Sequence, residues 1–281
     1  MLQLTYFVVF IMGKQRPSSS LDLNSWIDQR QSQGLYYFTR DGALKFLKTS
    51  ETALKQAATR LIKKNRIVRV YSGFYIIIPL EYASTGVLPA EWFITDLMDY
   101  VGQPYYVGLL SAAVLHGAAH QQPQQFQVVT DKPLREINLK NLTIRFFTKV
   151  NFSETPTTQI KVQTGFISAS DPEATAFDLL RYEKAVGGLD RVLTVLQELG
   201  EALDSALLVK AAKADGNVAY AQRLGWLLET AKFSDVVSKL AKWVSNQNPF
   251  AAKLEPSFSI KGAKKNERWR LLINTTVKGD L

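Results

Sequence analysis

Basic side chains are concentrated in one short stretch of the chain. Between positions 40 and 69 only two acids, Asp41 and Glu51, are present. They are outnumbered by nine basic residues: Arg40, Lys45, Lys48, Lys55, Arg60, Lys63, Lys64, Arg66 and Arg69. Such a local excess of positive charge attracts the phosphates of a polyanion. The stretch therefore predicts a surface for a polyanionic partner.

A helix beginning after Ser50 would position many of these side chains. Its apolar residues recur at i, i+3, i+4, i+7 and i+8, which predicts one buried stripe: Leu54, Ala57, Ala58, Leu61 and Ile62. The opposite face is polar and carries Thr52, Lys55, Gln56, Thr59 and Lys63. The Ser50 hydroxyl is suited to cap the first turn, and Thr49 is a second candidate for that cap.

A second, shorter helix and a hairpin flank this one. The short helix is expected from Arg40 to Leu47 with Thr39 as its cap, so that two residues, Lys48 and Thr49, separate it from the cap of the longer helix. The segments IVRVY and FYIII are rich in β-branched and aromatic residues, and Ser72-Gly73 between them is a two-residue turn signal. Two helices with a sharp turn, followed by a tight hairpin, predict a winged helix-turn-helix.

This arrangement assigns roles to individual side chains on duplex DNA. We expect the residues that face base edges in the major groove to be Thr52, Lys55, Gln56 and Thr59. The residues expected to position the backbone are Lys48, Arg60, Lys63, Arg69 and Ser72, with Ser50 at the helix start. Arg69 and Tyr71 lead into the hairpin tip, from which they could reach phosphate or the minor groove.

Two other sets of side chains, the histidines and a group of carboxylates, could form a metal or catalytic site, but their spacing indicates such a site less strongly. His116 and His120 are four residues apart, a spacing that metal sites use, but the residues between them include no acid and they are the two histidines of the chain. Ser170 or Asp171 is expected to cap a helix that has Pro172 at its first position and Glu173 in its first turn. Asp178 is expected to face solvent or to pair with Arg181. No nucleotide-binding glycine loop or nucleophile elbow is evident. We expect no catalytic residues, no metal and no cofactor.

Length and composition indicate the number of domains, the class of protein and the kind of partner. The chain has 281 residues, which favours two domains, and its 46% hydrophobic and 21% charged residues are typical of a globular protein. A net charge of +9 favours nucleic acid or another anionic surface. Zero cysteines exclude disulfides and thiolate metal sites, and are compatible with a reducing cytoplasm.

The first twenty residues need separate treatment. The run MLQLTYFVVFI is apolar, but no basic residue precedes it and it is too short to span a bilayer. Our hypothesis is that Met12 is the natural initiator, so that residues 1–20 are a disordered or mis-annotated leader. The first helix is then expected from Leu21 to Ser32.

The segment after Pro79 predicts a second, mixed α/β domain over residues 90–281 with a helical C-terminal part. Helices are expected from Pro89 to Gly102, from Gly108 to Ala119, from Pro172 onwards, and over Leu189 to Val244 with breaks at Gly200 and at Asp215 to Asn217. Strands are expected at FQVVT, LTIRFF and TGFISA, with a last weak strand at Trp269 to Ile273. The predicted fold class is therefore α+β, with the winged helix-turn-helix at residues 21–80.

Four blocks in this order resemble the AbiEi-family antitoxins, the transcriptional-regulator half of type IV toxin-antitoxin systems linked to abortive phage infection. The blocks are the module ending RVYSGFYIIIP, then YYVGLLSAAVLHG, SDPEATAFDLL and RLGWLLE. The resemblance implies an N-terminal domain that binds inverted repeats in its own promoter. It also implies a C-terminal domain that counters a nucleotidyltransferase-like toxin, without necessarily forming a stable complex with it.

The leading hypothesis is thus a cytoplasmic, non-catalytic autorepressor and antitoxin. Its partners would be double-stranded DNA and, functionally, a toxin, with two copies expected on one operator and no membrane association. One alternative is a module that uses a winged-helix fold to bind protein or RNA. Another is a catalytic C-terminal domain, for which the carboxylates near Asp171 would be the candidates.

Overall fold

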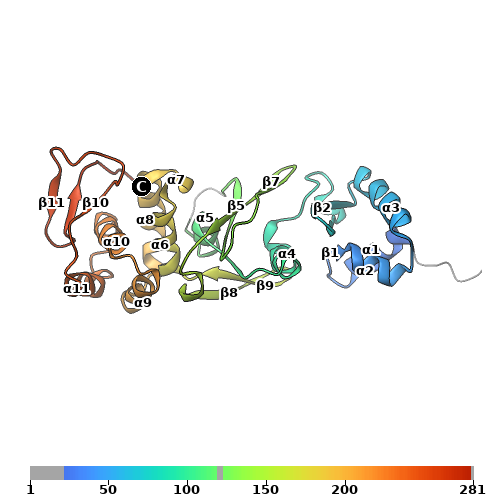
Figure 1. The fold of residues 1–281 in the computed structure, drawn as a ribbon, viewed down its shortest axis with the longest axis horizontal. Helices are drawn as coiled ribbons and strands as arrows, with labels where there is room; N and C mark the ends of the chain where they lie inside the picture. The colour runs from blue at the N-terminus through green and yellow to red at the C-terminus, as the bar shows by residue number, and fades with distance from the viewer. Residues whose placement is uncertain (1–21, 119–122, 280–281) are drawn as a thin grey trace, which may run out of the picture.

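The computed structural model describes residues 22–118 and 123–279. Within them the chain is a mixed α+β protein with several sheets. It is elongated, with the N-terminal helices at one end, a larger sheet in the middle and a small sheet near the C-terminus at the other end (Figure 1). Residues 1–20 and His120 lie outside the described residues, so the hypotheses about them stay predictions.

The N-terminal module contains the three expected helices and the expected hairpin, together with one strand, β1, that was not predicted. In chain order the elements are α1 (Leu23–Ser32), β1 (Tyr37–Thr39), α2 (Arg40–Leu47), α3 (Glu51–Lys63), β2 (Ile67–Tyr71) and β3 (Phe74–Ile77). The Thr39 hydroxyl accepts from the Gly42 amide at 3.1 Å and the Ser50 hydroxyl from the Ala53 amide at 3.2 Å, so both predicted caps are confirmed. The strands form a sheet in the order β1-β3-β2, in which Tyr71 pairs with Phe74 across the two-residue turn.

The middle of the molecule is a six-stranded mixed sheet in the order β6-β7-β5-β4-β9-β8. Its strands are β4 (Tyr105–Val107), β5 (Gln125–Thr130), β6 (Ile137–Leu139), β7 (Leu142–Thr148), β8 (Thr157–Val162) and β9 (Gly165–Ser170). The three strands predicted from apolar runs are β5, β7 and β9. The sequence analysis did not predict β4, β6 and β8, because β4 and β6 have three residues each and β8 is a largely exposed edge strand.

Alternation along the central strands separates two cores on the two faces of the sheet, and a third core lies within the N-terminal module. Tyr106, Val129 and Phe147 are neighbours across β4, β5 and β7, and they pack among the C-terminal helices. Val107 and Val128, the next pair in the same register, belong to a second core on the opposite face. Successive side chains of a strand point to opposite faces, so each central strand contributes to both cores.

Helices cover both faces of this sheet. The second core includes α4 (Ile94–Val101), and the first includes α5 (Leu109–Leu115), α6 (Pro172–Arg181) and the following helices. Those following helices are α7 (Glu183–Val186), α8 (Gly188–Leu199), α9 (Ser205–Asp215), α10 (Val218–Thr230) and α11 (Ser238–Asn246). Four short 3-10 turns lie between the described elements: η1 (Leu80–Tyr82), η2 (Ala90–Trp92), η3 (Phe152–Glu154) and η4 (Gly200–Ala202).

Several predicted boundaries need correction. The helix expected from Pro89 is a 3-10 turn followed by α4 from Ile94, because Phe93 has φ −137° and interrupts the helical backbone. The helical region from Leu189 has a further break at residues 231–237, where Lys232 has φ 71°. Ile62, expected on the buried stripe of α3, is 38% exposed. Each residue of an α-helix is rotated by about 100° around the helix axis, so Ile62 lies about 80° around the axis from Leu54, at the margin of the buried stripe.

The second core also extends into the N-terminal module. Phe74, Ile76 and Ile78 are buried in it together with residues of α4 and the central sheet. The Tyr100 hydroxyl donates to the Ser72 carbonyl at 2.9 Å, and its ring lies 5.5 Å from that of Phe74. The hairpin between β2 and β3 is therefore docked on α4 through its tip.

The C-terminal sheet is anchored on α10. It comprises β10 (Ala252–Lys253), β12 (Leu271–Ile273) and β11 (Lys264–Asn266), in that spatial order. Trp269 is fully buried, and its indole nitrogen donates to the Glu229 carboxylate at 2.7 Å. Gly225 makes room for the indole ring, because a Cβ at that position would lie 2.1 Å from Trp269.

We predict that Gly225→Ala destabilises the protein by about 1–3 kcal/mol, because the added methyl overpacks the Trp269 contact. A Gly to Ala change at an unhindered helix position stabilises by about 0.5–1 kcal/mol instead. Urea unfolding followed by tryptophan fluorescence measures the difference. Gly42→Ala in α2 is the comparison variant, because its Cβ would approach a single atom, the Thr39 hydroxyl at 3.0 Å, rather than a buried ring at 2.1 Å. Equal unfolding free energies for the two variants would contradict the prediction.

Candidate nucleic-acid interface

The exposed face of α3 is the centre of the candidate interface. Leu54, Ala58 and Leu61 of this helix are buried against α1 and β2, which turns the opposite face to solvent. All eleven residues predicted to contact DNA are exposed: Lys48, Ser50, Thr52, Lys55, Gln56, Thr59, Arg60, Lys63, Arg69, Tyr71 and Ser72. The structure thus leaves these side chains accessible, whereas contact with DNA stays a prediction.

Hydrogen bonds within the module use some of these groups. The Ser50 hydroxyl caps α3, and the Thr59 hydroxyl donates to the Lys55 carbonyl at 2.8 Å. The oxygen of Thr59 can still accept a hydrogen bond, and the amide of Gln56 has both donors and an acceptor. The polar face of α3 therefore presents the donor and acceptor groups that base edges require.

Two of the nine basic residues have structural partners. Arg40 pairs with Asp41 at 3.1 Å and with Glu51 at 3.2 Å, which joins the starts of α2 and α3. Arg66 pairs with Asp28 of α1 and donates to the Ile78 carbonyl. Within the described residues no ion pair joins the other seven to an acid: Lys45, Lys48, Lys55, Arg60, Lys63, Lys64 and Arg69. Their charges are available to an external anion.

The hairpin tip is held in place rather than free. Besides the bond from Tyr100 to Ser72, the Arg40 amide donates to the Gly73 carbonyl at 2.7 Å. Gly73 has φ +77°, and a Cβ there would lie 2.5 Å from the Tyr100 hydroxyl. The side chains of Tyr71 and Ser72 are exposed beside this docked backbone. This contact was not predicted, because no residue near the hairpin in the sequence indicates a contact with Tyr100.

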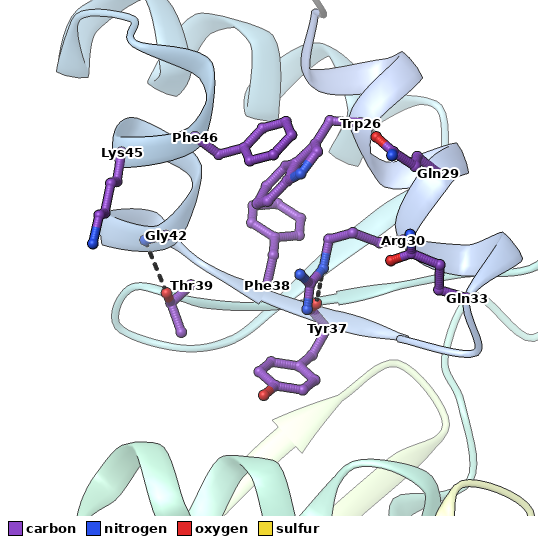
Figure 2. A pocket seen from close by; sticks show the side chains of 10 residues that line it. All are labelled: Trp26, Gln29, Arg30, Gln33, Tyr37, Phe38, Thr39, Gly42, Lys45 and Phe46. Atoms are coloured by element: carbon purple, nitrogen blue, oxygen red, sulfur yellow. Dashed lines mark hydrogen bonds between the residues drawn. The ribbon is translucent and has the colours of Figure 1, made fainter.

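A groove of about 700 Å³ lies on another side of the module, between α1, β1 and α2. Figure 2 shows Trp26 over Phe46 and Phe38, with ring centroids 5.2 Å and 5.7 Å apart. In the same view the Arg30 side chain donates to the Tyr37 carbonyl, at 2.8 Å. None of the eleven predicted DNA contacts lines this groove. The stacked Trp26 and Phe46 rings join α1 to α2.

The carboxylates of the second domain were the rival candidates for a site. Asp171 caps α6 through the Ala174 amide at 2.8 Å, and the Glu173 carboxylate accepts from the Asp204 amide at 2.7 Å. Burial raises the pKa of each carboxyl. The predicted role of Asp171 as a cap is confirmed, and Glu173 joins α6 to the start of α9.

The prediction that Asp178 faces solvent or pairs with Arg181 is wrong. It is fully buried, with the Lys149 ammonium at 2.8 Å and the Tyr106 hydroxyl at 2.9 Å. Arg181 pairs with Asp215 instead, at 2.7 Å. Asp178 lies on the sheet-facing side of α6, where burial raises its pKa.

No group of three or more His, Cys, Asp or Glu side chains is arranged to hold a metal ion in the described part of the chain. The Nε2 atom of His116 lies 2.7 Å from the Ser170 carbonyl, a contact that joins α5 to the end of β9. No helix of the described residues is long and apolar enough to cross a membrane.

The family resemblance is confirmed for part of the chain. Residues 106–230 match the family model described as the AbiEi antitoxin C-terminal domain. The chain is also similar in fold to the RV2827C protein from Mycobacterium tuberculosis, whose crystal structure aligns with a TM-score of 0.64 at 11% identity. That alignment covers 94% of this chain and 95% of the other. No curated protein matches the sequence.

We predict that the buried Lys149–Asp178 pair is structural. Asp178→Asn should cost about 3–5 kcal/mol of unfolding free energy, because it leaves the Lys149 charge buried without its counterion. The double variant Lys149→Met/Asp178→Leu should cost less than the sum of the single variants, as measured by urea unfolding. Lys161→Met, at an exposed position of β8, is the control. If Asp178→Asn kept full stability but abolished a metal-dependent activity, the group would be catalytic instead.

Proposed function

We propose, from the premise that this chain belongs to the AbiEi antitoxin family through its C-terminal domain, that it is an autorepressor and antitoxin of a type IV toxin-antitoxin system. In this proposal residues 21–80 form a winged helix-turn-helix that binds the promoter. Residues 90–281 form the antitoxin domain, which counters a nucleotidyltransferase-like toxin in the cytoplasm. The observation that carries the DNA-binding half is the face of α3, where polar side chains lie among exposed cations that pair with no acid of the described residues.

The connections in the module support a winged helix-turn-helix. Lys48, which ends α2, has φ 48°, and this left-handed residue turns the chain sharply before Ser50 caps α3. The hairpin of β2 and β3 follows α3 directly and pairs with β1 on its other side. A second helix that projects outward beside a hairpin is the geometry that places a recognition helix in the major groove.

Recognition divides between two sets of side chains. Thr52, Lys55 and Gln56 extend from the first turns of α3, the part of a recognition helix that enters the groove, and Thr59 follows one turn later. The flanking cations, Lys48, Arg60, Lys63 and Arg69, would contact phosphates and set the register of the helix on the duplex. Repression then follows from occupancy, because a protein bound over the promoter hinders the polymerase.

The docked hairpin tip supports coupling of the two halves. Tyr100 belongs to α4 of the second domain, and it fixes the backbone of Ser72 beside the predicted DNA contacts of the wing. Lys140, on the turn between β6 and β7, donates to the Asn65 side chain at 2.8 Å, just after α3. The antitoxin domain thus holds both ends of the DNA-binding surface. Two copies on inverted repeats are expected, since one unit reads few base pairs.

The test is a gel-shift titration on the chain's own upstream DNA, with random duplex as competitor. Lys55→Ala and Gln56→Ala should each cost about 1–3 kcal/mol on the promoter and reduce selectivity, because both side chains would face base edges. Lys63→Ala should weaken all sequences alike and reduce the salt slope by about one unit, because it would contact phosphate.

Lys161→Ala on the exposed edge strand β8 is the matched control and should leave the promoter affinity unchanged. Equal losses on promoter and random DNA for all three test variants would contradict the assignment of roles on α3. No selective shift by the parent protein would contradict DNA-specific repression altogether, and would favour the module that binds protein or RNA.

A further inference from the structure

The net charge is positive at both ends of the molecule and negative in its middle. Residues 22–80 have ten Lys or Arg against four acids, and residues 81–230 have twelve against seventeen. Residues 231–279 again have ten Lys or Arg against three acids, a net charge of +7. The two basic regions are at opposite ends of the elongated chain (Figure 1). The C-terminal region is therefore a second basic surface, far from α3, and it follows the segment that matches the antitoxin family model.

This second region has a rigid backbone. The side-chain amide of Gln222 on α10 donates to the carbonyls of Phe250, Trp269 and Arg270 at 3.1, 3.0 and 2.9 Å. Arg223, also on α10, donates to the Lys253 carbonyl at 2.8 Å. Together with the buried Trp269 indole, these bonds hold β10 and β12 on the helix. The basic end is a preformed surface of the folded domain.

Some of its cations hold this structure together. Lys253 donates to the carbonyls of the following loop, and Arg270 donates to the Asn248 side chain and the Pro249 carbonyl. Arg268 pairs with Glu229, and Lys265 with Glu267. Such side chains are occupied by internal partners and contribute less to recognition of another molecule.

Other lysines of the C-terminal region are not engaged in this way. Within residues 22–118 and 123–279 no ion pair joins an acid to the exposed Lys261 or to Lys264, and the same holds for Lys278. Lys239 and Lys242 add two exposed charges on the neighbouring helix α11. These five lysines are free to contact an external polyanion.

Exposed apolar side chains lie among these lysines. Phe258 is 53% exposed and Ile260 is 52% exposed, both in the loop that leads to Lys261. The backbone carbonyl of Phe258 accepts from Lys253 at 3.1 Å and from Asn274 at 3.2 Å, which holds the backbone that carries the ring. Phe250, just before β10, is 97% exposed. An exposed aromatic ring on a held backbone, with free cations in the same loop and the next strand, is the combination that binds unpaired bases and their phosphates.

We propose that the C-terminal sheet, with the loop from Glu255 to Ala263, binds single-stranded nucleic acid. Lys261 and Lys264 contact phosphates, and the ring of Phe258 stacks on a base. Duplex nucleic acid fits this surface less well, because its bases are already stacked on one another. An anionic membrane would require a continuous apolar face, whereas Lys261 directly follows Ile260 here. The proposal does not depend on DNA binding by α3.

The experiment uses the full-length chain and fluorescein-labelled 12-nucleotide oligomers: single-stranded RNA, single-stranded DNA of the same sequence, and the corresponding duplex. Fluorescence anisotropy should show tighter binding of a single strand than of this non-promoter duplex. A preference for RNA or for DNA tells which nucleic acid is the ligand, and either supports the proposal. Phe258→Ala should weaken single-strand binding about tenfold through lost stacking.

Lys261→Ala/Lys264→Ala tests the phosphate contacts independently of Phe258. It should weaken single-strand binding and reduce the salt slope by about 1.4, the value for two lost phosphate contacts. Both lysines are exposed and bear no structural bond among the described residues, so thermal unfolding should be unchanged. The matched control is Lys55→Ala/Lys63→Ala on α3, which should impair promoter binding but not binding of the single-stranded oligomers.

Two results would overturn the proposal. One is single-strand affinity in the Phe258 and lysine variants equal to that of the parent chain. The other is that these variants no longer sediment with phosphatidylserine vesicles, as the parent chain would, while they bind the oligomers as well as the parent chain does. The surface would then be a membrane contact. Failure of the promoter gel shift would contradict DNA repression by α3 but not this surface, because the two experiments report on different variants.

Discussion

The strict alternation of side chains along β4 and β5 is the constraint on which the rest of the structure depends. In these neighbouring strands Tyr106 and Val129 point to one face, and Val107 and Val128 to the other. Because both faces are apolar, both must be covered. The C-terminal helices cover one face, while α4 and the β3 segment of the N-terminal module cover the other.

Attachment of the module through this second core has consequences for the proposed DNA-binding surface. In an independent domain on a flexible linker the hairpin would move with its own helices. Here the Tyr100 hydroxyl donates a hydrogen bond to the Ser72 carbonyl at the hairpin tip, and the Lys140 ammonium donates one to the Asn65 side chain just after α3. These bonds hold α3 and the hairpin relative to the central sheet. A change in the rest of the molecule that moved α4 would therefore move the hairpin. This is a direct physical route by which the two proposed activities could influence one another.

The charge distribution complements this arrangement. The acidic middle contains the sheet that both of its flanking cores share, and many of its charged groups are engaged in internal bonds, such as the Lys149–Asp178 and Arg181–Asp215 pairs. The basic ends contain exposed lysines that form no ion pair within the part of the chain that the structure describes. Charges that hold the fold and charges available to a partner are thus separated along the long axis of the molecule (Figure 1).

The sequence by itself determined the local structure of the elements. The hydroxyl caps at Thr39 and Ser50, the carboxylate cap at Asp171, the polar face of α3 and the turn at Ser72-Gly73 all follow from interactions within a few residues, so they were predictable. The short strands β4 and β6 were not, because a three-residue strand is stabilised by its neighbours in the sheet rather than by its own pattern. Only the tertiary structure decided the partners of buried polar groups. No role was predicted for Lys149, and Asp178 was expected to face solvent or to pair with Arg181. Their pairing depends on β7 and α6 being brought together across 29 positions of the chain. The same holds for Tyr100 and the hairpin tip, since long-range contacts arise from packing of the cores and leave no periodic signal in the sequence.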